Sequence, residues 1–215
     1  MPHGQSSDRC ATHPAAHSVI GMTTTHANTT VRPRLAIIVG SVRTDRFGPV
    51  PSAWFADKAR EHGAMDVEVL DIADYDLPTS LDSNDDVVAL GEKLAAADAF
   101  VVVTPEYNHS FPAGLKTAID HYKPEWAAKP VAFVSYGGMA GGLRAVEQLR
   151  QVFAELHAVT IRNSISFHNF WDTFGDDGQP SDAASASSAA KQLLDQLMWW
   201  TVALKTAREQ HPYTS

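Results

Sequence analysis

The chain reads Val-Val-Val-Thr-Pro-Glu-Tyr-Asn-His-Ser-Phe-Pro-Ala-Gly-Leu-Lys-Thr-Ala-Ile-Asp from Val101 to Asp120. With Phe100, the first three residues form an apolar, β-branched run, which predicts a strand buried on both faces. Pro112 stands where a following helix would begin. The intervening residues 104–111 are rich in polar groups and follow the carboxyl end of the predicted strand. Because ligands bind at this edge of open α/β sheets, the stretch predicts a central strand and a binding loop.

Length and composition fit one domain with one hydrophobic core. The chain has 215 residues, of which 44% are hydrophobic, and its formal net charge is -8. This acidic balance argues against nucleic acid as a partner, and no apolar run is long enough to span a membrane. Cys10 is the only cysteine. It excludes an internal disulfide and suits a reducing compartment, so we expect a soluble, cytoplasmic protein.

The first residues differ from the rest of the chain. Residues 1–33 are polar and lack periodicity, which predicts a disordered N-terminal tail, and residues 34–210 hold the expected folded domain. The tail contains no apolar core long enough for a secretory signal. Met22 is an alternative natural start of the protein.

Short apolar runs alternate with helical segments along the predicted domain. The apolar runs predict five strands, at residues 35–39, 67–72, 100–103, 131–135 and 158–161. Helical spacing predicts five helices, at residues 50–62, 85–97, 112–120, 143–156 and 181–209. Residues 162–182 are expected to form a long loop. This alternation predicts a three-layer, doubly wound α/β fold with a parallel sheet, and five strands favour the flavodoxin-like order 2-1-3-4-5.

A second polar loop follows the first predicted strand. It reads Gly-Ser-Val-Arg-Thr-Asp-Arg-Phe-Gly from Gly40 to Gly48 and leads into a helix. Free helical amides and the helix dipole favour an anion there, and Arg43 could clamp two phosphate oxygens. The loop matches neither the dinucleotide fingerprint nor the nucleoside-triphosphate loop, so a terminal monophosphate fits better. The alternative is a plain turn whose arginines face water.

A glycine-rich loop, Tyr136 to Gly142, follows the fourth predicted strand. In the order 2-1-3-4-5, strands one and three flank the point where the direction of winding changes. The loops after strands one and three should therefore meet in one crevice, with the glycine-rich loop beside them. This convergence favours a shared binding site.

Three motifs together resemble those of the NADPH-dependent FMN reductases. They are Gly40-Ser-Val-Arg43 with Arg46 and Gly48, then Thr104-Pro-Glu-Tyr-Asn108 followed by Leu115-Lys116, then Ser135-Tyr-Gly-Gly138 with Gly141-Gly142. The family includes flavin, quinone, azo-dye and chromate reductases on a flavodoxin-like fold. The resemblance covers residues 35–205. It implies bound FMN, NADPH or NADH as the electron donor, a small-molecule acceptor, and a homodimer or homotetramer.

The resemblance also implies roles for particular residues. Ser41 and Arg43, with the amides up to Gly48, would hold the FMN phosphate, and Arg46 would approach that phosphate or the phosphate of a pyridine nucleotide. Residues 105–108 would line the isoalloxazine, and the turn at residues 135–138 would meet its pyrimidine end. The candidate cofactor-binding residues are Ser41, Arg43, Arg46, Phe47, Gly48, Pro105, Glu106, Tyr107, Asn108, Ser135, Tyr136, Gly137 and Gly138. We predict no catalytic side chain and no metal ligand, because hydride passes from the nicotinamide to the flavin and the cofactor carries the reaction.

Three further expectations concern residues around these loops. Glu106 is expected to contribute its backbone amide while its carboxylate faces solvent. Asp71, at the end of the second strand, is expected to cap a loop. Residues 167–171 either reach the site of a neighbouring subunit or cover the protein's own core.

The predicted function is that of an NAD(P)H-dependent FMN oxidoreductase, which passes hydride through FMN to free flavin, a quinone or a similar acceptor. The alternative is a flavodoxin-type electron carrier that does not oxidise pyridine nucleotides. The phosphate loop lacks the Ser/Thr-rich pattern of such carriers, which argues against this alternative. A flavin-free regulatory or scaffold protein is the third reading.

Overall fold

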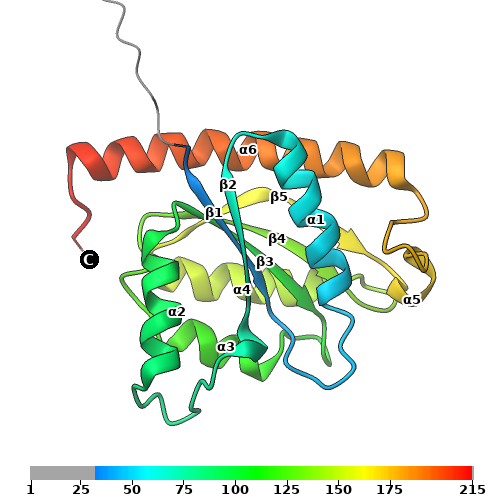
Figure 1. Ribbon diagram of the computed structural model, residues 1–215, viewed down its shortest axis with the longest axis horizontal. Helices are drawn as coiled ribbons and strands as arrows, with labels where there is room; N and C mark the ends of the chain where they lie inside the picture. The colour runs from blue at the N-terminus through cyan, green and yellow to red at the C-terminus, as the bar shows by residue number, and fades with distance from the viewer. Residues whose placement is uncertain (1–31, 215) are drawn as a thin grey trace, which may run out of the picture. The chain divides into compact units, whose positions relative to one another are not determined.

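A parallel five-stranded sheet lies between two layers of helices in the computed structural model, which describes residues 32–214 (Figure 1). Its strands are β1 (Arg34–Val39), β2 (Asp66–Asp71), β3 (Ala99–Pro105), β4 (Pro130–Tyr136) and β5 (Val159–Phe167). The strand order is β2-β1-β3-β4-β5, which confirms the predicted doubly wound, flavodoxin-like fold. The predicted N-terminal tail lies almost entirely outside the described residues.

Helices cover both faces of the sheet. On one face lie α1 (Pro49–His62) and α6 (Ala183–Gln210), and on the other lie α2 (Asp85–Ala96), α3 (Ala113–Asp120) and α4 (Leu143–Glu155) (Figure 1). Two short elements, η1 (Ile72–Asp74) and α5 (Phe170–Thr173), add to the five predicted helices. None of the helices within residues 32–214 is long and apolar enough to cross a membrane.

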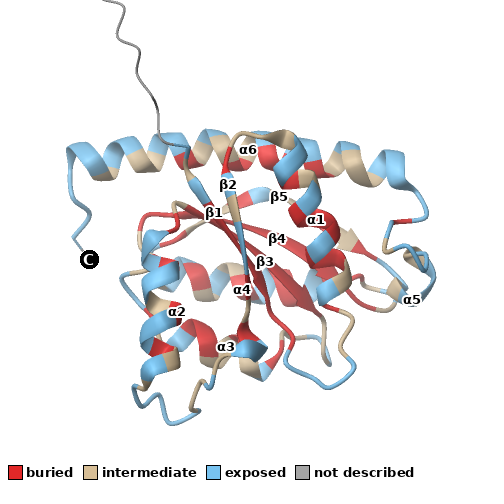
Figure 2. Ribbon diagram, in the orientation of Figure 1, coloured by how far each residue is buried: buried red, intermediate tan, exposed pale blue. Residues whose placement is uncertain are grey.

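The central strand β3 supplies both halves of the core. All seven of its residues are buried, in contrast to β2 at the border, where only Leu70 is buried. Phe100 and Val102 pack toward α2, α3 and α4, while Val101 and Val103 pack toward α1 and α6. A strand whose alternate side chains face two apolar layers must be apolar throughout, which is why its sequence is a continuous run. Figure 2 shows this buried centre.

The fifth strand departs from its prediction. Residues 162–182 were expected to be a loop, but β5 continues to Phe167 and α5 follows. The pairing with β4 passes from Val131↔Thr160 to Phe133↔Ser164, so β5 has two extra residues in a bulge. A bulge interrupts the period of two along a strand. The expected strand therefore stopped at Ile161, before the alternation resumes.

Arg150 of α4 lies against this bulge. Its Nη1 donates to the carbonyl of Ile161 at 2.7 Å, and its Nη2 donates to the carbonyl of Arg162 at 3.2 Å. Backbone groups that a bulge removes from the ladder need other partners. The guanidinium group provides them and fixes β5 to α4.

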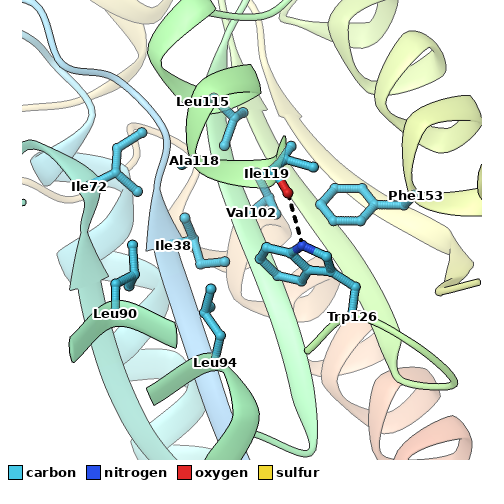
Figure 3. Close-up of a pocket in the computed structure, with 10 residues that line it drawn as sticks. All are labelled: Ile38, Ile72, Leu90, Leu94, Val102, Leu115, Ala118, Ile119, Trp126 and Phe153. Atoms are coloured by element: carbon cyan, nitrogen blue, oxygen red, sulfur yellow. Dashed lines mark hydrogen bonds between the residues drawn. The ribbon is translucent and has the colours of Figure 1, made fainter. Parts of the chain in front are cut away.

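A small cavity lies between the sheet and helices α2, α3 and α4 (Figure 3). Its volume is about 10 Å³, and its lining is apolar: Ile38, Ile72, Leu90, Leu94, Val102, Leu115, Ala118, Ile119, Trp126 and Phe153. The indole Nε1 of Trp126 donates to the carbonyl of Ile119 at 3.2 Å, which satisfies the polar atom nearby. A void of this size holds at most one water, so this cavity is a packing defect and cannot be a cofactor site.

Lys129 is an exception to the apolar interior. The residue is only 7% exposed, and its Nζ donates to the carbonyls of Leu94 and Ala95 at 2.9 Å each. These carbonyls belong to the last turn of α2, where a cation is favourable. Burial nevertheless lowers the pKa of Lys129 from 10.5 to about 8, and the nearby Arg208 adds to this effect.

The lowered pKa of Lys129 makes stability depend on pH. Between the folded and unfolded pKa values the unfolded chain binds more protons, so this residue makes stability rise with pH. We expect Lys129→Met to lose a rise of about 2 kcal/mol between about pH 7.5 and about pH 9.5. Urea unfolding at both pH values measures it. Lys191→Met, at an exposed lysine of α6, is the control. The same pH dependence in Lys129→Met as in the wild type would contradict the assignment.

Candidate functional site

Direct contacts join the loops after β1, β3 and β4 at the carboxyl edge of the sheet. The Ser41 and Tyr107 hydroxyls share a hydrogen bond of 2.9 Å, which links the β1 loop to the β3 loop. The amide of Glu106 donates to the carbonyl of Tyr136 at 3.1 Å, which links the β3 loop to the end of β4. The predicted convergence of the three loops is therefore present in the structure.

The β1 loop contains a run of backbone amides that have no hydrogen-bond partner in the described part of the protein. The amide of Gly40 donates to the carbonyl of Val103 at 2.8 Å and fixes the start of the loop. Within residues 32–214, none of the eight amides of residues 41–48 donates a hydrogen bond of standard geometry to another group. Consecutive free amides in a loop form a concave site for anions. We call residues 41–48 the cradle; its unpartnered amides suit an anion such as a phosphate group.

The first turn of α1 does not add amides to this cradle. Pro49 and Pro51 have no N–H, the amide of Val50 donates to Phe47 at 3.0 Å, and the amide of Ser52 donates to Gly48 at 3.2 Å. The expectation of free helical amides was therefore wrong, and the two prolines are the reason. The helix contributes its dipole, while the loop contributes the donors.

The two arginines of the β1 loop have different surroundings. Arg46 forms an ion pair with Asp71, which also caps η1 by accepting from the amide of Ala73 at 3.1 Å. Asp71 thus caps a loop as predicted, and it also neutralises Arg46. Arg43 is exposed, lies 5.4 Å from the ring centroid of Tyr107, and has no carboxylate partner among the described residues. Arg43 is consequently the cation of this loop that is available to an anion.

Several candidate side chains lie behind the loops. Ser41 is fully buried against Tyr107, and Ser135 is fully buried and donates to the carbonyl of Gly141 at 2.8 Å. Tyr136 is buried, which raises its pKa far above the usual value. Its ring and that of Phe47 pack against Phe170. These side chains hold the loops in place and do not form the loop surface; Gly48, Pro105 and Gly137 are likewise buried.

The β3 loop is a tight hairpin. The amide of Tyr107 donates to Ser110 at 2.8 Å and the amide of Ser110 donates back at 3.0 Å. The two residues between them, Asn108 and His109, have φ values of 49° and 69°. Such two-residue turns need the left-handed conformation at both positions, which Asn tolerates well and His less well. The turn places Asn108 at an exposed tip.

The structure narrows which amides of residues 105–108 can face a ligand. Pro105 has no N–H, and the amides of Glu106 and Tyr107 donate to protein carbonyls, so only that of Asn108 is free. The Glu106 side chain is 7% exposed and pairs with Arg144 Nε at 2.7 Å, so the expectation of a solvent-facing carboxylate was wrong. Arg144 was missed. Its position in the sequence was a signal that it has an anionic partner, because a cation in the first turn of a helix opposes the helix dipole.

The glycine-rich loop is held by the segment that follows β5. The amide of Gly137 donates to the carbonyl of Phe167 at 3.1 Å, and the amides of Asn169 and Phe170 donate to Gly138 and Gly137 at 3.0 and 3.2 Å. Trp171 is 60% exposed, and a Cβ atom at Gly138 would lie 3.4 Å from its ring. Residues 167–171 therefore cover the protein's own glycine-rich loop.

The strand order and the helices on both faces define a flavodoxin-like protein. The family model for NADPH-dependent FMN reductases matches residues 33–172, and the chain belongs to this family. An NAD(P)H-dependent FMN reductase of Schizosaccharomyces pombe is 37% identical over 133 residues, which cover 57% of this chain and 66% of the relative. The chain thus spans about two thirds of the length of that relative.

Two further proteins are similar to this chain. An NADPH:quinone oxidoreductase of Arabidopsis thaliana is 37% identical over 147 residues, which cover 62% of this chain and 74% of the plant protein. Among solved structures, the flavoenzyme NAD(P)H:(acceptor) oxidoreductase of Paracoccus denitrificans matches with a TM-score of 0.65 and 23% identity. The match covers 80% of this chain and 98% of that protein. This structural likeness supports the flavodoxin-like fold.

The glycine-rich loop allows a direct test of its geometry. Gly142 has a φ of 87°, and a Cβ atom there would lie 2.6 Å from the Cβ of Ser135. We expect Gly142→Ala to lower the free energy of unfolding by at least about 1–2 kcal/mol, because of the left-handed backbone and this clash. Gly138→Ala, where a Cβ has ordinary space, is the control. Equal urea midpoints for both variants would show that the described loop is wrong.

Proposed function

We propose that this protein is an NAD(P)H-dependent FMN oxidoreductase that reduces a small acceptor. The observation that carries the proposal is the run of free amides in residues 41–48 with the unpaired Arg43, adjoining the hairpin and the glycine-rich loop. Membership of the NADPH-dependent FMN reductase family supports FMN as the flavin and NAD(P)H as the donor.

The proposed roles follow from the polar groups of each loop that have no partner within the described residues. The amides of residues 41–48 and the guanidinium of Arg43 hold the phosphate through charge-assisted hydrogen bonds. Arg46 shapes the same loop from its ion pair with Asp71. The buried Ser41 contributes by fixing the loop to Tyr107. The phosphate site is therefore made of backbone and one arginine, and its remaining side chains are supports.

The flavin ring is proposed to lie where the β3 hairpin and the glycine-rich loop meet. Asn108 offers a free amide there, and the ring of Trp171 lies beside Gly138. Bound FMN supplies the chemistry of accepting a hydride and passing it on. The chain binds and orients the reactants, and its backbone donors stabilise charge that develops on the ring.

The acceptor, the assembly and the location are also proposals. The plant relative is named for a quinone, so we propose a quinone or free flavin as the acceptor. We propose a homodimer or homotetramer on the basis of the family resemblance. A cytoplasmic location is proposed because Cys10 is the only cysteine.

A visible spectrum of the purified protein with added FMN, followed by anaerobic NADPH and NADH, is the first test. We expect a perturbed flavin band that bleaches on addition of a nucleotide, without a stable one-electron reduced form. A bound flavin that neither nucleotide reduces would contradict the proposal and favour the electron carrier. An unperturbed spectrum would mean that the β1 loop does not bind FMN.

Arg43→Ala tests the phosphate site. Loss of a charged hydrogen bond should weaken FMN binding by about 1.5–3 kcal/mol, which is roughly 10- to 150-fold in Kd. Titration followed by quenching of flavin fluorescence measures this loss. Arg60→Ala is the control, because Arg60 is an exposed arginine of α1 that pairs with Asp57. Equal affinity in the two variants would remove Arg43 from the site.

A further inference from the structure

Arg144 occupies an unfavourable place for a cation. It is the second residue of α4, whose first turn has no acidic residue. The amino end of a helix carries partial positive charge, so an arginine there needs an anionic partner. Glu106 of the β3 loop is that partner. The contact between Arg144 and Glu106 therefore joins the helix to the β3 loop, although the two residues are 38 positions apart in the chain.

Arg144 contacts one residue before the hairpin turn and one residue within it. Its Nε pairs with Glu106 Oε1 at 2.7 Å, and its backbone amide donates to Glu106 Oε2 at 3.1 Å. Both carboxylate oxygens are thus occupied, on a side chain that is 7% exposed. The Nη1 of the same arginine donates to Nε2 of His109. One residue therefore holds the position before the turn and the second position within it.

Gln148, one turn further along α4, continues this contact. Its Nε2 donates to the carbonyl of His109 at 2.8 Å, and its Oε1 accepts from the hydroxyl of Ser110 at 2.6 Å. The turn that these bonds hold contains two consecutive left-handed residues, which are costly outside glycine. Side chains of α4 thus stabilise a backbone conformation that its own sequence only partly favours.

The opposite side of the hairpin is fixed as well. Tyr107 directs its hydroxyl to Ser41 in the β1 loop, while the adjacent Glu106 directs its carboxylate to α4. Asn108 lies between these two attachments and is exposed. Its free amide therefore has a fixed position relative to both the phosphate loop and the glycine-rich loop.

We infer that Arg144 is a positioning residue, which acts through Glu106 and His109 to set the place of the Asn108 backbone at the flavin site. This inference rests on the proposed function. Removal of the guanidinium leaves the largely buried Glu106 carboxylate without its cationic partner and with only the backbone amide of residue 144 as a donor. This costs more than the loss of an ion pair in which both partners are exposed. The hairpin should then leave its position. The flavin should lose the Asn108 amide as a hydrogen-bond donor that is already in place before binding.

We call the contacts of Arg144 with Glu106 and His109 the clamp. Amide hydrogen exchange of the apoprotein tests the clamp without any flavin. We expect Arg144→Gln to raise the exchange of the hydrogen-bonded amides of Glu106, Tyr107 and Ser110 by about tenfold or more, with the strands unchanged. The double variant Glu106→Gln/Arg144→Gln, which buries no charge, should restore part of the protection. Arg144→Lys should show exchange between that of the wild type and that of Arg144→Gln, because an ammonium group cannot make the several contacts of a guanidinium group. Gln148→Ala provides a milder variant in case Arg144→Gln does not fold.

Flavin binding and kinetics then test the positioning role. We expect Arg144→Gln to weaken FMN binding by about tenfold or more and to shift the visible band of bound FMN, with partial rescue in the double variant. Arg150→Gln, on the same helix but at the β5 bulge, is the control and should leave both unchanged. Unaltered exchange in Arg144→Gln would overturn the clamp, and raised exchange with normal binding and spectrum would overturn the positioning role. If the wild type does not bind FMN, the proposed function fails, while apoprotein exchange still decides on the clamp.

Discussion

The structure of the site depends on the attachment of the β3 hairpin to both of its neighbours. The order of the sheet places β3 between β1 and β4, so a loop at its carboxyl end can reach the loops on either side. Tyr107 is bonded to the β1 loop, and Glu106 is bonded to the helix that follows β4. Two consecutive residues with side chains in opposite directions thus assemble three loops into one surface. Without these bonds, the loops would share an edge of the sheet but not a defined geometry.

The polar groups that are free to bind a ligand lie outside the packed apolar core of this protein. The cavity within the core is small and apolar, while the unused polar donors lie in the β1 loop and at the tip of the hairpin. Most of the arginines near the site have protein partners, since Arg46 and Arg144 are each paired with a carboxylate. Of these three arginines, Arg43 is therefore the one without a carboxylate partner among the described residues, in a chain of net charge -8. An anionic cofactor is attracted to one defined place and not to a broad basic surface.

The sequence predicted the sheet well because burial dictates it directly. A strand such as β3, which faces two apolar layers, can only be a continuous apolar run, and such runs are visible without a structure. The end of β5 was missed because a bulge interrupts its period beyond Ile161. In the site, the three loops were identified by their residue types. The partner of each polar atom was less accessible: the carboxylate of Glu106 depends on a residue 38 positions away in the chain, while the amides at the start of α1 are used locally by Phe47 and Gly48. The position of Arg144 at the start of a helix was the one overlooked local signal.

The bulge in β5 has a consequence for how copies of this protein meet. A border strand offers backbone groups to which a strand of another molecule can add, and proteins that remain separate usually obstruct such borders. In β5 the carbonyls of Ile161 and Arg162 already accept from Arg150. The irregular backbone and the cationic side chain together interrupt the template that an incoming strand would need. At these two residues the β5 border is thereby obstructed against the addition of a strand from another molecule.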